Sequence, residues 1–105
     1  MRESDIEAYL VAQVGSVGGE CRKFTSPGHR GVADRICFFP CGLVILAETK
    51  RPKGGVISVS QQREAWRMSK VGTPTYFLDS KSSVDTLIAL AVDQIAKRKH
   101  QGAST

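Results

Sequence analysis

Residues 31–61 have the sequence GVADRICFFPCGLVILAETKRPKGGVISVSQ, and this stretch decides the fold. Its segments RICFFP and LVILAET are apolar on both alternating faces, which is typical of strands in the centre of a sheet. The three residues PCG between them indicate a tight turn. The stretch therefore predicts two adjacent antiparallel strands that are covered on both sides.

A helix is predicted directly after this hairpin. Ser58 and Gln61 have the spacing of a capping box, in which each side chain binds a backbone N–H group near the other residue. The basic, glycine-rich segment RPKGG separates the second strand from this point. We therefore expect a helix over residues 58–70, with Gly72 as its stop.

The sequence before and after this region predicts the remaining elements. Ser4 and Glu7 repeat the capping-box spacing, so a first helix is expected over residues 4–14. Short strands are expected over residues 20–25 and 75–78. A final helix, capped by Ser82 or Ser83, has an apolar stripe made of Val84, Leu87, Ile88, Ala91 and Ile95.

The order helix, three strands, helix, strand, helix predicts an α/β fold. A central sheet with helices on both faces is the natural way to bury these elements. The chain has 105 residues, which is enough for one domain with its own core. We expect that domain over residues 1–99 and a disordered tail over residues 100–105.

The charge balance favours a polyanionic partner. Lys and Arg number 15 and Asp and Glu number 10, which gives a net charge of +5. Nucleic acid is the first candidate for such a basic chain.

The cysteines and the hydropathy pattern indicate the cellular setting. The three cysteines include no CxxC pair, and a zinc site with His29 or His100 would match no common module. The longest apolar run, residues 36–47, is interrupted by Pro40 and Gly42 and is too short to cross a bilayer. We expect no signal peptide, no membrane contact and a reduced, cytoplasmic protein of a bacterial or phage-infected cell.

The register of the hairpin decides whether its acidic residues meet. Glu48 and Lys50 point to the same side of the second strand, because side chains alternate along a strand. A three-residue turn over residues 40–42 places Asp34 opposite Glu48, with their Cβ atoms about 4.5–5.5 Å apart. A two-residue turn would place Asp34 opposite Thr49, and the carboxylates would lie on different faces unless a bulge intervened.

Two carboxylates that face each other repel, so a compensating charge is expected. A divalent cation, Lys50 or both would supply it. Hard oxygen ligands suit Mg²⁺ or Mn²⁺, which would polarise a phosphodiester and activate a water. Lys50 is protonated at neutral pH, so we expect it to stabilise transition-state charge. In the alternative interpretation, Glu48 and Lys50 are a solvated pair and Asp34 only forms a turn.

The combined pattern resembles the virus-type replication-repair nuclease (VRR-NUC) domain, a branch of the PD-(D/E)xK nuclease superfamily. The resemblance covers nearly the whole chain. It consists of Glu7 in the first helix, Gly31-x-x-Asp34-Arg35, Glu48-x-Lys50, Ser58-x-x-Gln61 and Gly72 before the last strand. One departure is Ala33, which stands where the motif usually has proline and is expected to soften the loop.

The resemblance implies a restriction-endonuclease-like αβββαβα core with a mixed central sheet flanked by helices. It also implies DNA hydrolysis with Mg²⁺ or Mn²⁺, with Asp34, Glu48 and the carbonyl of Thr49 as metal ligands. Lys50 would be catalytic. Gln61 would support the site, and Glu7 would reach it as a further catalytic and metal-binding residue, although helix capping explains these two residues as well.

The resemblance further implies a homodimer that acts on branched DNA such as four-way junctions. The segments SPGHRG and RPKGG, together with the residue after Asp34, are expected to bind DNA phosphates through His29, Arg30, Arg35, Arg51 and Lys53. For Trp66, stacking on a base is one interpretation, but packing in the core or in a dimer interface is favoured for a lone tryptophan on a helix. The alternatives are an inactive DNA-binding module of the same fold and a small basic interaction protein.

Overall fold

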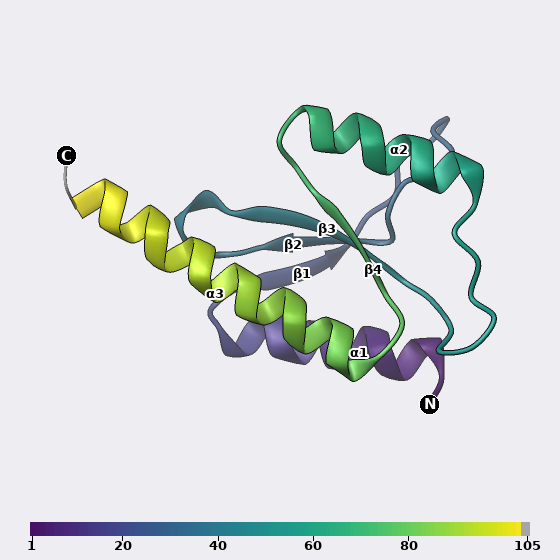
Figure 1. The fold of residues 1–105 in the computed structure, drawn as a ribbon, viewed down its shortest axis with the longest axis horizontal. Coiled ribbons are helices and arrows are strands. Elements are labelled where there is room, and N and C mark those ends of the chain that lie inside the picture. Colours follow the sequence, from purple (N-terminus) through teal and green to yellow (C-terminus); the bar gives the residue numbers. More distant parts are fainter. Residues whose placement is uncertain (104–105) are drawn as a thin grey trace.

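The computed structural model describes residues 1–103 (Figure 1). It confirms the expected α/β class and element order. The elements are α1 (Glu3–Ser16), β1 (Glu20–Lys23), β2 (Arg35–Phe38), a 3₁₀ turn η1 (Pro40–Gly42), β3 (Val44–Thr49), α2 (Val59–Lys70), β4 (Thr75–Leu78) and α3 (Lys81–Ala103).

The four strands form one mixed sheet in the order β1-β2-β3-β4. The pairs β1–β2 and β2–β3 are antiparallel, while β4 runs parallel to β3 because α2 forms the crossover between them. Figure 1 shows α1 and α3 together on one face of the sheet and α2 on the other. This arrangement confirms the expected mixed sheet flanked by helices.

The core lies between the sheet and the α1–α3 pair. The apolar stripe predicted for the last helix is largely buried there. The core cluster consists of Ile6, Leu10 and Val14 from α1, Val84, Leu87, Ala91 and Ile95 from α3, and Cys37, Phe39, Leu43, Ile45, Ala47 and Leu78 from the sheet region.

The second face of the sheet is covered less completely. In β3 every residue after Val44 is buried, as expected for a strand covered on both sides. In β2, by contrast, the Phe38 side chain is 44% exposed. The expectation of complete cover therefore holds for most of β3 but not for β2, because α2 is short and buries no residue fully.

Both outer helices begin earlier than the sequence pattern predicts. At α1 the Asp5 carboxylate accepts a hydrogen bond from the Arg2 N–H group (2.8 Å), so the predicted capping box of Ser4 and Glu7 is wrong. At α3 the Ser80 hydroxyl accepts from the Ser83 N–H group (3.0 Å), and Ser83 accepts in return from Ser80 N–H (3.1 Å). As in a capping box, these two reciprocal bonds give backbone N–H groups at the start of the helix a hydrogen-bond acceptor.

The end of the chain also differs from expectation. The helix α3 continues to Ala103, so residues 100–103 of the predicted disordered tail are helical. Residues 104–105 lie outside the described part of the chain. Within the described part, no helix is long and apolar enough to span a membrane.

Candidate active site

The hairpin adopts the three-residue register that brings the two acidic residues together. Phe39 N–H donates to the Leu43 carbonyl (2.8 Å), which closes the turn. Arg35 pairs with Ala47, so the next position along the ladder places Asp34 opposite Glu48. The Asp34 N–H group donates to the Glu48 carboxylate (3.1 Å). The alternative of a two-residue turn is therefore excluded.

Glu48 occupies an environment that disfavours its negative charge. Its side chain is only 8% exposed, whereas Asp34 is exposed. Burial raises the pKa of Glu48 to about 7, and hydrogen bonding with the Asp34 carboxyl and its charge add to this effect. The site is consequently an acidic pair that lacks full compensation and favours a proton or a cation.

Lys50 is held beside this pair by the first turn of α2. Its ammonium donates to the Gln61 side-chain oxygen (2.8 Å) and lies 4.0 Å from the Glu48 carboxylate. The same Gln61 oxygen accepts from Ser58 N–H (3.0 Å), while Ser58 Oγ accepts from Gln61 N–H (3.1 Å). The capping box of α2 is confirmed, and the two interpretations of Gln61 are compatible because one oxygen makes both contacts.

Glu7 approaches the site from α1 but has another partner. Its carboxylate binds the Arg35 guanidinium at 2.7 Å, and the Arg35 side chain is 13% exposed. Glu7 and Asp34 line one hollow of about 320 Å³ together with Lys23, Phe24 and Thr25. The Arg35 guanidinium is therefore largely buried and paired with Glu7, and its contact with a DNA phosphate stays a prediction.

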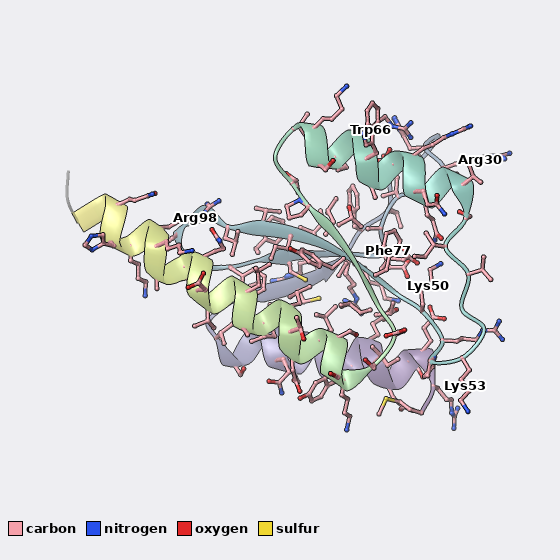
Figure 2. All side chains as sticks on the ribbon, in the orientation of Figure 1. Arg30, Lys50, Lys53, Trp66, Phe77 and Arg98 are labelled. Carbon is pink, nitrogen blue, oxygen red and sulfur yellow. The ribbon has the colours of Figure 1, made fainter. Side chains whose placement is uncertain are left out.

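The other predicted basic contacts lie on the surface. His29, Arg30, Arg51 and Lys53 are all exposed. Figure 2 shows Arg30, Lys50 and Lys53 toward one end of the long axis, with Arg98 toward the other. These four residues are therefore accessible to a partner, and their contact with DNA stays a prediction.

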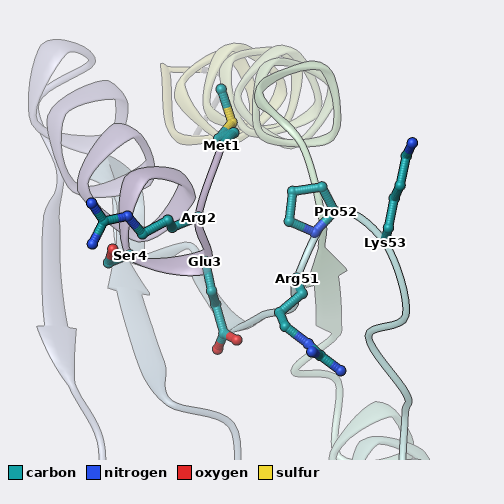
Figure 3. Close-up of a pocket in the computed structure, with 7 residues that line it drawn as sticks. All are labelled: Met1, Arg2, Glu3, Ser4, Arg51, Pro52 and Lys53. Atoms are coloured by element: carbon teal, nitrogen blue, oxygen red, sulfur yellow. The ribbon is translucent and has the colours of Figure 1, made fainter.

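Two neighbours of the site were not predicted from the sequence. The start of α1 forms one wall of a hollow of about 630 Å³, and Arg51, Pro52 and Lys53 form the other wall (Figure 3). Phe77 lies beside Glu48 as its register partner in β4 and, with Asp79, lines a smaller hollow next to Lys50. The alternation of side chains in TYFL assigns Phe77 to one face of the last strand. Only the parallel pairing with β3 shows that this position lies beside Glu48.

Comparison with known proteins identifies the family. A phage protein, "Putative nuclease p44" of Acyrthosiphon pisum secondary endosymbiont phage 1, is 40% identical over 90 residues, which cover 86% of this chain and 96% of that protein. A solved structure described as "VRR_NUC domain" superposes with a TM-score of 0.77 and 28% identity, covering 83% of this chain and 94% of the other. The chain belongs to the VRR-NUC family. No protein-family model matches it.

The donor groups of this VRR-NUC chain fit a hard divalent cation with few protein ligands. Within residues 1–103, no cluster of three or more His, Cys, Asp or Glu side chains forms a metal site. The two carboxylates of Asp34 and Glu48, with the carbonyl of Thr49, would leave positions for water and a phosphate oxygen, as Mg²⁺ prefers. The Thr49 side chain points to the opposite face of β3 from Glu48, because side chains alternate along a strand, so the main-chain carbonyl of Thr49 is the group that fits this role.

The VRR-NUC motif residue Gly31 locks the SPGHRG loop onto α2. Its φ is +78°, and a Cβ atom there would overlap the backbone of Ser60. Only glycine permits this approach, because a side chain has neither the space nor the preferred backbone conformation. The contact explains why two parts of the motif, far apart in sequence, belong to one site.

Gly31→Ala is expected to destabilise the fold by about 2–4 kcal/mol and to lower activity, because the loop must leave α2. Urea unfolding of both proteins measures the loss. Gly28→Ala is the matched control, because Gly28 has a similar φ of +82° but a Cβ atom there would meet no other atom within 4 Å. Equal losses in the two variants would show that the Ser60 contact contributes nothing.

Proposed function

We propose that this VRR-NUC chain is a metal-dependent DNA endonuclease that hydrolyses phosphodiester bonds. Asp34, Glu48 and the Thr49 carbonyl would bind Mg²⁺ or Mn²⁺. The observation that carries the proposal is the pairing of Asp34 with a buried Glu48, whose pKa is raised to about 7 by burial and by Asp34. A cation would remove the cost of burying this charge beside another carboxylate.

The bound cation would polarise the scissile phosphate and lower the pKa of a water. Lys50 provides a second positive charge on the same side of β3. Because Gln61 accepts from its ammonium, Lys50 keeps a fixed direction and remains a hydrogen-bond donor for a phosphate oxygen. Gln61 is thus a positioning residue. Arg35 binds the Oε1 atom of Glu7, so Glu7 would act as a metal ligand through its other oxygen or after release from Arg35.

The proposed substrate is branched DNA such as a four-way junction, cut by a homodimer. Exposed apolar side chains support a second protein surface on the α2 side. Val59 and Trp66 are 61% and 62% exposed, and the Lys70 ammonium lies over the Trp66 ring at 4.3 Å. The expectation that Trp66 packs in the core of the chain is therefore wrong; of the two remaining interpretations, a dimer interface and stacking on a base, we propose the dimer interface.

The central experiment is a cleavage assay with Mn²⁺ on a four-way junction, a flap and a plain duplex. We expect the junction to be cut fastest and Glu48→Gln to be inactive on all three. Binding of the junction without cleavage, by a chain that binds Mn²⁺, would identify an inactive DNA-binding module instead. Absence of both binding and cleavage would favour a protein that interacts with something other than DNA.

Metal affinity should depend on pH through Glu48. A metal binds the ionised carboxylate, and the raised pKa means that a proton competes for Glu48 below about pH 7. We expect Mn²⁺ affinity to fall about tenfold for each pH unit below 7 and to level off above it. Calorimetry between pH 5.5 and pH 8 tests this, and an affinity that stays constant down to pH 5.5 would contradict it.

The exposed basic residues should contribute affinity without sequence preference. Arg51→Ala and Lys53→Ala are each expected to weaken DNA binding about threefold to tenfold and to reduce the slope of log affinity against log salt by about 1. Fluorescence anisotropy over a salt series provides the measurement. Lys97→Ala is the control, because Lys97 is exposed on α3 and pairs with Asp93 (3.0 Å). A similar loss for Lys97→Ala would mean that affinity reflects net charge alone.

A further inference from the structure

Two cysteines face each other across the first two strands, outside the residues assigned to cleavage. Cys21 in β1 and Cys37 in β2 are register partners, and their sulfur atoms lie 3.9 Å apart. Both are free thiols. A buried Cys37 alone would be explained as a small core residue, but a second thiol at the matching position requires a separate explanation.

The backbone holds this pair in the geometry that a disulfide needs. Phe24 N–H donates to the Asp34 carbonyl (2.7 Å), which makes these two residues a hydrogen-bonded pair of the β1–β2 ladder. Hydrogen-bonded and non-hydrogen-bonded pairs alternate along an antiparallel ladder, so three steps away Cys21 and Cys37 form a non-hydrogen-bonded pair. The Cα atoms of such a pair lie about 4.5 Å apart, within the range of about 4.4–6.8 Å that disulfides span.

The two thiols differ in accessibility and in environment. Cys21 is partly exposed, whereas Cys37 is fully buried. The hydrogen bond from the Cys37 thiol lowers the pKa of Cys21, and the nearby positive charge of Arg35 acts in the same direction. An oxidant from solution would therefore meet Cys21 first, and Cys37 would be positioned to complete the reaction.

The geometry points to Cys21 and Cys37 as a reversible oxidation site that closes into an intramolecular cross-strand disulfide when the chain meets a small-molecule disulfide, RSSR. The Cys21 thiolate attacks one sulfur of RSSR and releases RS⁻. Cys37 then loses its proton and attacks the Cys21 sulfur, which releases the second RS⁻. In sum, two protein thiols lose two electrons and two protons, and RSSR becomes two RSH.

The site adjoins the candidate active site without belonging to it. Cys37 lies on the strand that follows Asp34, and Arg35 connects the same strand to Glu7 on α1. Closing the bond would tie the edge strand β1 to β2. The inference is independent of the nuclease proposal, because thiol chemistry and not DNA cleavage reports on it.

The test uses the full chain with Cys41→Ser, which removes the exposed third thiol and with it most disulfide exchange between molecules. After incubation with oxidised glutathione, we expect intact mass to fall by two hydrogen atoms and both remaining thiols to resist alkylation. The melting temperature should rise by roughly 10 °C, because the bond closes a loop of about 16 residues. Dithiothreitol should reverse all three changes.

Two further variants of this protein identify the order of attack. With Cys37→Ala, a glutathione adduct should accumulate on Cys21, because no second thiol displaces it. With Cys21→Ser, the buried Cys37 should stay unmodified. Three results would each overturn the inference. They are two thiols that still react with the alkylating agent after oxidation, a glutathione adduct that persists when both cysteines are present, and dimers joined through Cys21.

Discussion

Replacing Lys50 with alanine is expected to slow DNA cleavage by about 10²–10³-fold while changing Mn²⁺ affinity by no more than about twofold. The ammonium lies 4.0 Å from Glu48, too far for a close ion pair, and its short contact is with the neutral oxygen of Gln61. Its charge is thus available to a phosphate whose negative charge grows in the transition state. Removing it should affect the chemical step and not the metal ligands.

Single-turnover cleavage with saturating Mn²⁺, paired with calorimetry, separates these effects. Lys97→Ala is the control, because Lys97 is an exposed lysine on α3 that pairs with Asp93 and has no role in the proposed site. A large loss of metal affinity in Lys50→Ala would reassign the lysine to organising Asp34 and Glu48. An unchanged cleavage rate would remove it from the mechanism.

Replacing Glu48 with glutamine is expected to abolish measurable Mn²⁺ binding and to reduce cleavage more than about 10³-fold, since the proposed charged ligand is lost. The same change should stabilise the metal-free protein at pH 8 by about 1–3 kcal/mol. The variant should thus lose metal binding and cleavage but gain stability without metal. The reason is that a buried, charged carboxylate destabilises the metal-free fold, whereas a bound cation would compensate its charge. Glutamine retains an oxygen that accepts from Asp34 N–H.

The sign of the stability effect follows from the raised pKa of Glu48, which is about 7 in the fold against 4.5 ordinarily. Between these values the folded state binds more protons than the unfolded state, so stability falls as pH rises through this window. Below about pH 4.5 both states are protonated, and wild type and variant should unfold alike.

Urea unfolding with EDTA at pH 8 and at pH 4 measures this difference. Glu20→Gln is the control, because Glu20 is 69% exposed and pairs with the exposed Arg22. A Glu48→Gln protein that is less stable than wild type at pH 8 would mean that the buried charge is already compensated within the chain. Retained Mn²⁺ binding would remove Glu48 from the metal site.

The sequence predicted the parts of the site that depend on local spacing. Turn length and side-chain alternation reduced the hairpin to two registers, and the structure selects the three-residue turn that places Asp34 opposite Glu48. The capping box of Ser58 and Gln61 was equally local. Recognition of the VRR-NUC pattern added the order in which these pieces appear.

The features that the sequence did not predict correctly are contacts between elements distant in sequence and the exact starts of two helices. The ion pair between Glu7 on α1 and Arg35 on β2 was not predicted, because it joins residues far apart in the chain, and the roles expected of the two residues toward metal and DNA stay predictions. Trp66 is 62% exposed, so only the core alternative for this residue is wrong, and its place in a dimer interface stays a proposal. The helix starts were misplaced because Asp5 and Ser80 compete with neighbouring cap residues of similar chemistry.

One Gln61 oxygen both caps α2 and accepts from Lys50, so unfolding of the first turn of α2 on heating would affect the site. If the first turn of that helix frays, the bond that steers Lys50 disappears together with the cap, although the sheet and its core remain intact. Heat should therefore inactivate the protein at temperatures where its overall shape still persists. The chain would recover fully on cooling, since only one turn has to rewind.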